Sequence, residues 1–407
     1  MGALAVGEAT TMPELVARAV PSSNERGWVQ YMSVAPCSDG AFWLVWSTEG
    51  LPSYYFKLPW TERENAPEVG LFCKCVASDG KVLVPPVRIV EPVLVKMMGS
   101  PAAPSAFHAQ SQPNGNLVVI ANLRTPSDGA SRIMEKRQTA VLSVSRAGRV
   151  RRLLLDSVAD ISRNSWHDRV DAAFWPWHDT HGNLHFLLGM WEVPVLHFEL
   201  PSTDTSPELH ARSTLFFRAN GPADSAALVA QNPGVVARTS LTWTGDNWRY
   251  SALLPLSDSI LLVVYDPAVH EQRYAWRDQR PWDTMVVYRL RVDDLSVVDS
   301  IRVAAKLVAG TDYAGVTISR AILERTPEGY VFLIGTSDGT MSYEFDREAK
   351  PMLGGRQQAQ AGRATDADVS LDQLISILDP LAPGVPRQFH WFGLTSAGRL
   401  CHESYPR

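Results

Sequence analysis

Histidine, tryptophan and carboxylate side chains gather in one segment near the middle of the sequence. Five of the ten histidines lie between His167 and His197. Imidazole and carboxylate groups that lie close together can bind zinc, or act as acid and base toward a polar substrate. The candidates for binding or catalysis in this segment are Trp166, His167, Asp168, Arg169, Trp177, His178, Asp179, His181 and His185.

The dipeptide Gly182-Asn183 predicts a hairpin turn inside this segment. Such a turn brings His181 and His185 toward one another across two strands, which makes them the only metal-ligand candidates. Their spacing matches no zinc motif, and neighbouring side chains of a strand point to opposite faces. We therefore predict no metal and no cofactor. In the structural alternative, the tryptophans fill gaps between sheets while histidine and aspartate hold a loop in place.

A second segment combines aromatic rings with arginines. Residues 266–283 separate two expected strands, and long connections on a rigid scaffold commonly carry binding groups. Aromatic faces and guanidinium groups together can stack on a sugar, hold a carboxylate or anchor a protein interface. Alternatively, Arg-Trp stacks and Arg-Asp pairs hold the loop itself. The binding candidates here are Trp248, Arg249, Arg273, Trp276, Arg277, Asp278 and Trp282.

Four cysteines, Cys37, Cys73, Cys75 and Cys401, are too few for a disulfide scaffold in a chain of 407 residues. A reducing compartment, and so a cytoplasmic location, is the plainer expectation. Cys73 and Cys75 face the same side of an expected strand, but no second cysteine pair supplies the other ligands of a zinc site. We expect them to be buried thiols beside a sheet.

The elements that position these residues are strands separated by turn dipeptides. Asp39-Gly40, Asp79-Gly80 and Asn114-Gly115 each precede an apolar run. Asn-Gly and Asp-Gly permit the positive φ angles of hairpin turns. Each dipeptide is therefore a place where antiparallel strands reverse.

The strands are of two kinds. Runs such as Ile260–Tyr265 are continuously apolar, whereas the segments 54–58, 286–290 and 340–345 alternate. A strand covered on both faces can be apolar throughout, and an outer strand alternates because one face meets water. An inner apolar strand followed by an outer alternating strand is typical of a propeller blade.

The composition agrees with an all-β chain, since 13 Trp, 13 Phe and 11 Tyr accompany 27 Gly and 28 Pro. We predict a single β-propeller of six or seven four-stranded antiparallel blades over residues 28–406. Residues 1–27 form an N-terminal extension, with a short helix as one alternative. Phe389–Leu394 is expected to share a blade with Trp28–Met32 and so close the ring.

Two insertions interrupt the repeat. Residues 354–368 lack an apolar period, which predicts a mobile loop. Ser370 and Gln373 have capping-box spacing, and Leu371, Leu374 and Ile375 share one helical face, which predicts a short helix near residues 370–379.

The segment Ser337-Asp338-Gly339-Thr340 resembles the Asp-box turn of sialidase-like propellers. It departs from that pattern because Asp338 and Gly339 are adjacent and no aromatic residue follows Thr340 directly. No sialidase catalytic residue is carried over, and the resemblance to β-propellers over residues 28–406 is one of architecture.

Net charge and missing motifs exclude several function classes. A net charge of −5 argues against a broad nucleic-acid or anionic-lipid surface. No apolar run reaches membrane-spanning length. The sequence also lacks the zinc-protease His-Glu-x-x-His, the nucleophile-elbow, the phosphate-loop and the dinucleotide-binding motifs. We expect neither nucleic acid nor a membrane as a partner.

The leading hypothesis is a non-enzymatic binding propeller that recognises a protein or glycan partner through loops rich in Trp, Arg and Asp. One alternative is a carbohydrate-active hydrolase or lyase on an acidic polysaccharide. In that case His178 or His181 acts as acid or base, and Arg169 or Arg277 neutralises the substrate. A further alternative is a neutralising or adaptor protein for another bacterial protein.

Overall fold

A computed structural model describes the strands of the chain and the shorter turns between them. Contacts within the chain form two compact units: unit 1 is Met1–Arg169 with Gly362–Arg407, and unit 2 is Val170–Ala361. The described residues, with short gaps inside several ranges, are 8–12, 15, 27–124, 137–158, 173–178, 184–200, 212–217, 235–239, 252–265, 284–304, 322–358, 369–377 and 388–406.

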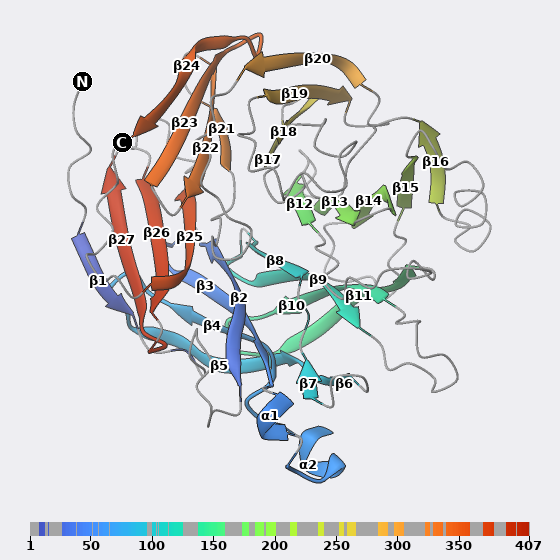
Figure 1. The fold of residues 1–407 in the computed structure, drawn as a ribbon, viewed down its shortest axis with the longest axis vertical. Coiled ribbons are helices and arrows are strands. Elements are labelled where there is room, and N and C mark those ends of the chain that lie inside the picture. The colour runs from blue at the N-terminus through green and yellow to red at the C-terminus, as the bar shows by residue number, and fades with distance from the viewer. Residues whose placement is uncertain are drawn as a thin grey trace. The chain divides into compact units, whose positions relative to one another are not determined.

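Unit 1 holds three four-stranded antiparallel sheets and a two-stranded ribbon, drawn in blue, cyan, green and red in Figure 1. The first sheet is β2 (Trp28–Pro36), β3 (Phe42–Glu49), β4 (Gly70–Val76) and β5 (Val82–Val90). The second is β8 (Ala106–Ser111), β9 (Leu117–Arg124), β10 (Arg137–Val144) and β11 (Val150–Val158). The third is β25 (Val369–Ile377), β26 (Gln388–Thr395), β27 (Leu400–Pro406) and β1 (Glu8–Met12). Strands β6 (Val93–Val95) and β7 (Ser100–Ala102) pair with each other, and the short helices α1 (Pro52–Tyr55) and α2 (Trp60–Glu64) lie between β3 and β4.

Unit 2 also holds three sheets. The first has five strands: β12 (Ala173–His178), β13 (Leu184–Met190), β14 (Val193–Leu200), β15 (Arg212–Phe217) and β16 (Val235–Thr239), of which the last two are parallel. The second is β17 (Ala252–Pro255), β18 (Ser259–Tyr265), β19 (Thr284–Arg291) and β20 (Val297–Ala304). The third is β21 (Ile322–Arg325), β22 (Gly329–Thr336), β23 (Gly339–Asp346) and β24 (Pro351–Gln358).

Within each unit, neighbouring sheets meet along their first strands. Strand β2 contacts β8 and β25 in unit 1, and β17 contacts β12 and β21 in unit 2. In unit 1 the amide of Ala109 on β8 donates to Ser33 Oγ on β2 at 3.1 Å. Successive four-stranded sheets that meet through their first strands are the blade arrangement that the sequence predicts.

The run Phe42–Trp46 of strand β3 shows why an inner strand can be apolar on both faces. Trp43 and Val45 pack with the sheet β8–β11, whereas Phe42, Leu44 and Trp46 pack with Phe392, Leu394 and Leu400 of the third sheet. Successive side chains of a strand point to opposite faces. Other sheets cover both faces of β3, so the side chains that pack on each face are apolar. Residues 42–48 are all buried.

Among the described residues, six hairpins close through one shared turn geometry. In each five-residue turn, the backbone amide of the fourth residue donates to the carbonyl of the first residue. The backbone amide of the first residue donates to the carbonyl of the fifth. The fourth residue has positive φ, as is typical of a three-residue hairpin loop with a bulge. The turn dipeptides at residues 39–40, 79–80 and 114–115 are therefore confirmed as hairpins. The turns are 37–41, 77–81, 112–116, 145–149, 346–350 and 395–399.

The helix predicted near residues 370–379 is wrong, because residues 369–377 form strand β25, paired with β26. The same residues also carry a period of two, with Val369, Leu371, Ile375 and Ile377 at alternate positions. Pairing with β26 satisfies the backbone of the segment, so the tertiary context overrides the capping-box signal. The prediction of an outer strand at residues 54–58 is also wrong, since α1 ends at Tyr55 and residues 57–58 lie in a turn.

The strand that completes the sheet of Phe389–Leu394 is β1 rather than Trp28–Met32. Glu8–Met12 pairs with β27, whereas Trp28–Met32 belongs to β2, the first strand of the next sheet. Sheet strands therefore begin at Glu8 and not at residue 28. The expected loop 354–368 is a strand in its first part, because β24 extends to Gln358, and residues 359–368 lie outside the described ranges. The helix considered within residues 1–27 also lies largely outside them.

None of the helices in the described part of the chain has the length and apolar character needed to cross a membrane.

Candidate functional site

Most of the residues predicted from the sequence to form a site lie outside the described ranges. His178 is the last residue of β12, the first strand of its sheet. The turn at Ser337-Asp338 is not described, and Gly339 begins β23. The site predictions outside the described residues are Trp166, His167, Asp168, Arg169, Asp179, His181, Trp248, Arg249, Arg273, Trp276, Arg277, Asp278 and Trp282.

Trp177 and His185 are the two predicted residues whose side chains are described. They are cross-strand partners on β12 and β13, and their rings stack at a centroid distance of 5.1 Å with 14° between the planes. Trp177 is 3% exposed and His185 6% exposed. Their described contact is therefore internal packing within the sheet.

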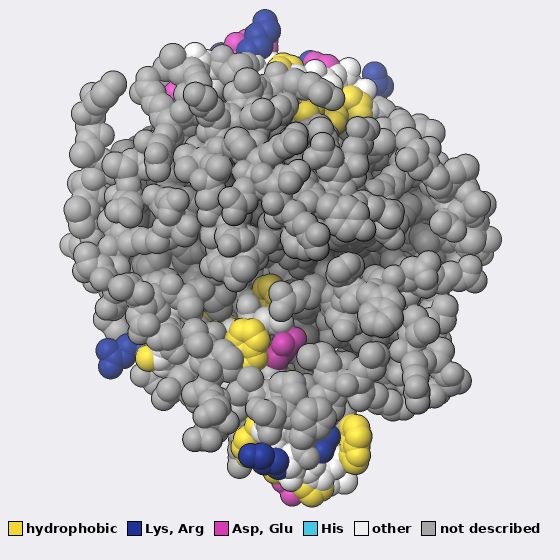
Figure 2. Space-filling model, in the orientation of Figure 1, with side chains coloured by type: hydrophobic (Ala, Val, Ile, Leu, Met, Phe, Trp, Pro, Cys, Tyr) yellow, Lys and Arg dark blue, Asp and Glu magenta, His cyan; other side chains and the backbone are white. Residues whose placement is uncertain are grey.

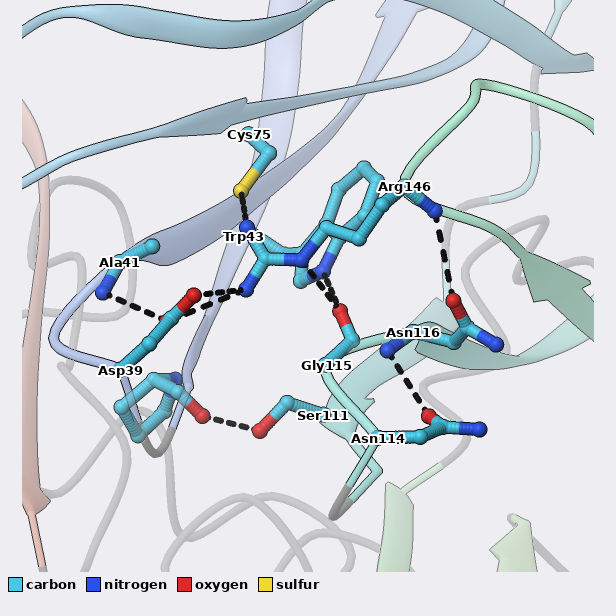
Figure 3. Close-up of polar contacts among 10 residues, drawn as sticks. Asp39, Ala41, Trp43, Cys75, Ser111, Asn114, Gly115, Asn116 and Arg146 are labelled. Atoms are coloured by element: carbon cyan, nitrogen blue, oxygen red, sulfur yellow. Dashed lines mark hydrogen bonds and ion pairs between the residues drawn. The ribbon is translucent and has the colours of Figure 1, made fainter.

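A dense polar network joins the first two sheets of unit 1 at their hairpin turns (Figure 3). Arg146, in the turn between β10 and β11, reaches three acceptors. Its Nη2 pairs with both carboxylate oxygens of Asp39 at 2.9 and 3.1 Å, and its Nε donates to the carbonyl of Gly115 at 2.8 Å. Its Nη1 donates to Sγ of Cys75 at 2.9 Å. We call Asp39, Trp43, Cys75, Gly115 and Arg146 the Arg146 network.

Trp43 and Gly115 fix where the guanidinium lies. The buried indole of Trp43 donates to the Gly115 carbonyl at 3.0 Å, and Arg146 lies over its ring at 5.9 Å. Gly115 has a φ of +80°, and a Cβ there would lie 3.0 Å from Nε of Arg146. Glycine is therefore required both by the turn and by the close approach of the arginine.

Three buried thiols, Cys75 of the network and its neighbours Cys37 and Cys73, differ in their protonation. The Cys37 thiol donates a hydrogen bond to Cys75, and the nearby Arg146 cation adds to its effect, so the pKa of Cys75 is lowered. The same hydrogen bond, together with burial, raises the pKa of Cys37. Burial raises the pKa of Cys73 to about 12. Within this buried cluster, the Cys75 sulfur is the one on which a thiolate is favoured.

A second buried polar pair lies between the first and third sheets of unit 1. Nδ1 of His390 on β26 is 2.8 Å from Nε2 of His402 on β27. Phe42 lies against both imidazoles, at centroid distances of 5.1 and 5.3 Å. Burial lowers the pKa of both histidines to about 4, with the charge of His402 adding to the effect on His390. We call these two residues the histidine pair.

The helical insertion presents an exposed aromatic ring. Trp60 on α2 is 52% exposed, and the guanidinium of Arg63 lies 4.8 Å from the centre of its ring. Arg63 is buried and donates through Nε to the carbonyl of Leu58 at 2.9 Å. Figure 2 shows hydrophobic and basic side chains together on the surface at the place of α1 and α2 in Figure 1.

These clusters have different chemical capacities. Within the described ranges, no group of three or more His, Cys, Asp or Glu side chains is placed to hold a metal ion. The Arg146 network supports thiol chemistry. Hydrolysis of a glycoside normally uses two carboxyl groups that flank the bond, and the single carboxylate of this network is paired with Arg146.

Sequence reasoning missed Arg146, the histidine pair and Trp60. Arg146 lies in a turn without an Asn-Gly or Asp-Gly signal, so only the fold places it beside Cys75. A signal for the histidine pair was present, because His390, Phe392 and Leu394 alternate on one strand, as do Leu400 and His402 on the next. Histidines at inward positions of two adjacent strands indicate a buried contact.

The fold is that of a β-propeller protein, as predicted from the sequence, with antiparallel four-stranded blades apart from the five-stranded sheet β12–β16 and its parallel last pair. No protein-family model and no curated protein sequence matches the chain. Among solved structures, an α-L-arabinanase from Penicillium chrysogenum in complex with arabinobiose is similar, with a TM-score of 0.51 and 10% identity over 97% of this chain and 98% of that one.

Two further solved structures have the same level of similarity. The α-L-arabinofuranosidase Arb93A from Fusarium graminearum has a TM-score of 0.50 and 10% identity, over 98% of each chain. The NanB sialidase from Streptococcus pneumoniae has a TM-score of 0.50 and 6% identity, over 96% of this chain and 70% of that one. At such low identity the similarity establishes the fold alone.

The comparisons correct the preferred functional hypothesis. The sequence favoured a non-enzymatic binding propeller, and that preference is wrong, because the matched structures are carbohydrate-active enzymes. They favour the carbohydrate-active alternative. The names of these three enzymes refer to carbohydrate substrates or ligands of those proteins, and none of them names a protein partner.

Proposed function

We propose that this protein is a carbohydrate-active enzyme that hydrolyses glycosidic bonds of a polysaccharide or oligosaccharide. The observation that carries the proposal is the similarity of nearly the whole chain, 97%, to nearly the whole of an arabinanase. The three similar enzymes named above act on arabinose-containing or sialic-acid-containing glycans according to their names. An acidic or arabinose-containing glycan is accordingly the substrate class to test first.

The first strands of the sheets are where we propose that the reaction takes place. The blades of a propeller surround a central channel, and first strands of neighbouring sheets contact one another in both units. In unit 2, polar residues on these strands include His178 on β12 and Glu324 on β21. A carboxyl group can serve as acid, base or nucleophile in glycoside hydrolysis.

The exposed side chain of Trp60 is a second feature that supports a carbohydrate ligand. Aromatic rings with a polar tip commonly serve at wet binding surfaces. The buried Arg63 lies over the ring of Trp60 and limits its motion, so less side-chain freedom is lost when a ligand binds. A flat, held indole surface is suited to the apolar face of a sugar ring.

The test is turnover of a panel of arabino-oligosaccharides, sialylated oligosaccharides and uronic-acid polysaccharides, with products separated by chromatography. Glu324→Gln should lower kcat by about 100-fold or more if the residue is an acid or base in the reaction. His178→Ala tests the residue that the sequence proposed. Asp299→Asn, on the outer strand β20, is the matched control and should retain activity. Absence of turnover on the whole panel would remove the proposal.

A further inference from the structure

The helical insertion, residues 52–68 between β3 and β4, has a small apolar core of its own. Tyr55 and Ala66 are buried together with Val69, and Leu58 packs against them. The phenol of Tyr55 donates to Oε1 of Glu68 at 2.8 Å, and the amide of Leu58 donates to the carbonyl of Tyr55 at 2.9 Å. The insertion is therefore held by its own packing and hydrogen bonds, and it presents its outer side chains on a firm support.

The ring of Trp60 is covered on one face by an arginine that is itself fixed. Arg63 is 8% exposed, its Nε donates to the carbonyl of Leu58, and its guanidinium lies over the indole. Trp60 nevertheless has the largest exposed fraction, 52%, among the large apolar side chains of the described residues. Because the arginine covers one face, the exposed surface belongs to the other face and the edges of the ring, which a flat ligand can reach.

The surroundings of Trp60 differ from those of a protein interface. Its exposed neighbours include Lys57, Thr61 and Glu62. Among the described residues, the other large apolar side chains that are exposed lie on β5, β11, β20 and β24, and not in the insertion. The core of a protein interface is instead rich in aromatic rings and depleted of charged side chains. A single ring among charged neighbours fits a small polar ligand better.

The charges of the insertion do not favour an anionic ligand. Its sequence holds two cations and three carboxylates, which are Lys57, Arg63, Glu62, Glu64 and Glu68. A surface for a polyanion needs an excess of positive charge. An uncharged sugar ring has C–H groups on its faces, which the negative face of an indole attracts, and hydroxyl groups at its edges, which charged side chains can bond.

We propose that Trp60 is the centre of a binding site for neutral polysaccharides, in which a sugar ring stacks on the open face of the indole. Lys57 and Glu62 supply hydrogen bonds to its hydroxyl groups. The site holds the polysaccharide and uses none of the residues proposed for the reaction. The choice of a carbohydrate ligand rests on the proposed function, but binding at this site does not require turnover.

The first experiment uses the unchanged protein. Hydroxyl radicals oxidise exposed aromatic and sulfur-containing side chains, and peptide mass spectrometry measures the rate at each residue. Met352 is the internal control, because it is 47% exposed and lies on β24, outside the insertion. We expect at least one of four dissolved neutral polysaccharides, arabinan, arabinoxylan, galactomannan and β-glucan, to lower the oxidation of Trp60 relative to Met352 by at least about threefold. Polygalacturonate should leave this ratio unchanged.

Substitutions then test the ring itself. In native gels that contain the protecting polysaccharide, Trp60→Ala should bind at least about tenfold more weakly than the unchanged protein. Trp60→Tyr keeps a flat ring and should lose less. Met352→Ala removes an exposed apolar side chain elsewhere and should migrate as the unchanged protein does. Should Trp60→Ala fail to fold, the oxidation of Trp60 in the unchanged protein still decides.

Three results would each overturn the proposal. They are the absence of protection by all four neutral polysaccharides, equal or stronger protection by polygalacturonate, and equal binding by folded Trp60→Ala. The proposed hydrolysis is tested separately. Binding that depends on Trp60 in a protein without turnover would remove the hydrolase and leave this site, whereas turnover without protection of Trp60 would do the reverse.

Discussion

At the scale of single residues, Arg146 shows how one side chain can join two blades. Its guanidinium bonds to Asp39 and Cys75 of one sheet and to the Gly115 carbonyl at a turn of the next. Because each of these bonds involves a charged group, it is stronger than a neutral hydrogen bond. Removing the arginine leaves a buried sulfur without that donor and the Asp39 carboxylate without its cation.

Arg146→Met should therefore lower the free energy of unfolding by about 1–3 kcal/mol, the usual cost of leaving buried polar groups unpaired. Chemical denaturation followed by fluorescence measures the change. Arg289→Met is the control, because Arg289 forms an ion pair with Asp299 at 2.5 Å on the surface. The two side chains are 40% and 47% exposed, so this pair should contribute less than about 1 kcal/mol. Equal effects of the two variants would show that the Arg146 network adds no stability beyond a surface ion pair.

The histidine pair makes stability depend on pH. The pKa of each histidine is about 4 in the folded protein and 6.5 as the ordinary value. Between these values the unfolded chain binds protons that the folded chain does not. The contribution of the histidine pair to the free energy of unfolding is therefore fully present above pH 6.5. It falls as the pH drops from 6.5 toward 4, and it changes no further below pH 4.

Urea unfolding between pH 4 and 7 should show a loss of a few kcal/mol from this pair, at about 1.4 kcal/mol for each unit of pKa difference. The double variant His390→Leu/His402→Leu removes both titrating groups and keeps apolar bulk beside Phe42. Its stability should fall less over the same range. Parallel curves for the two proteins would contradict the assigned cause.

At the scale of elements, the repeated hairpin turn depends on one residue with positive φ. Five of the six described turns place glycine there, and the turn 346–350 places Ala349 there with a φ of 64°. A side chain in the left-handed region costs about 1–2 kcal/mol, because Cβ approaches the following carbonyl.

Ala349→Gly should raise the free energy of unfolding by up to about 1 kcal/mol, because glycine adopts this positive φ without strain. The gain is reduced because glycine gives the unfolded chain more conformational entropy and because the buried alanine methyl group is lost. Gly148→Ala is the matched reverse change, at the same position of the turn 145–149 with a φ of 74°. It should lower stability by a similar amount. A measured loss on Ala349→Gly would mean that the burial of the alanine methyl outweighs the strain.

At the scale of the whole molecule, strand β1 joins the first described segment of the chain to the last. Glu8–Met12 pairs with β27, and the side chain of Met12, 2% exposed, packs with Phe392, Leu394 and Leu400. This pairing covers the edge of β27, which would otherwise present unpaired backbone groups to other chains.

Met12→Ala should lower the free energy of unfolding by about 2–5 kcal/mol, as is usual for truncation of a buried methionine. Val82→Ala, at a position 42% exposed on β5, should change it by less than about 0.5 kcal/mol. Thermal unfolding of both variants checks the difference. A Met12→Ala variant as stable as the Val82→Ala variant would show that β1 does not close the sheet in solution.

Hairpin dipeptides and strand periodicity are local signals, so the class of fold could be predicted from the amino-acid sequence alone. Asp39-Gly40 and Asn114-Gly115 form the predicted turns, and the apolar run Phe42–Trp46 of β3 is buried on both faces. The sequence also indicated that Cys73 and Cys75 are buried thiols. The cytoplasmic location and the loop residues around His181 and Trp276 stay predictions.

Which residues contact one another depends on how the strands pair and how the sheets pack. The segment 369–377 fits a helical period as well as a strand period, and its pairing with β26 selects the strand. Arg146 lies 71 residues from Cys75 in sequence, and His390 12 residues from His402, yet each pair is within hydrogen-bond distance. No local pattern encodes the contact of Arg146 with Cys75, because it arises from the packing of one sheet against another.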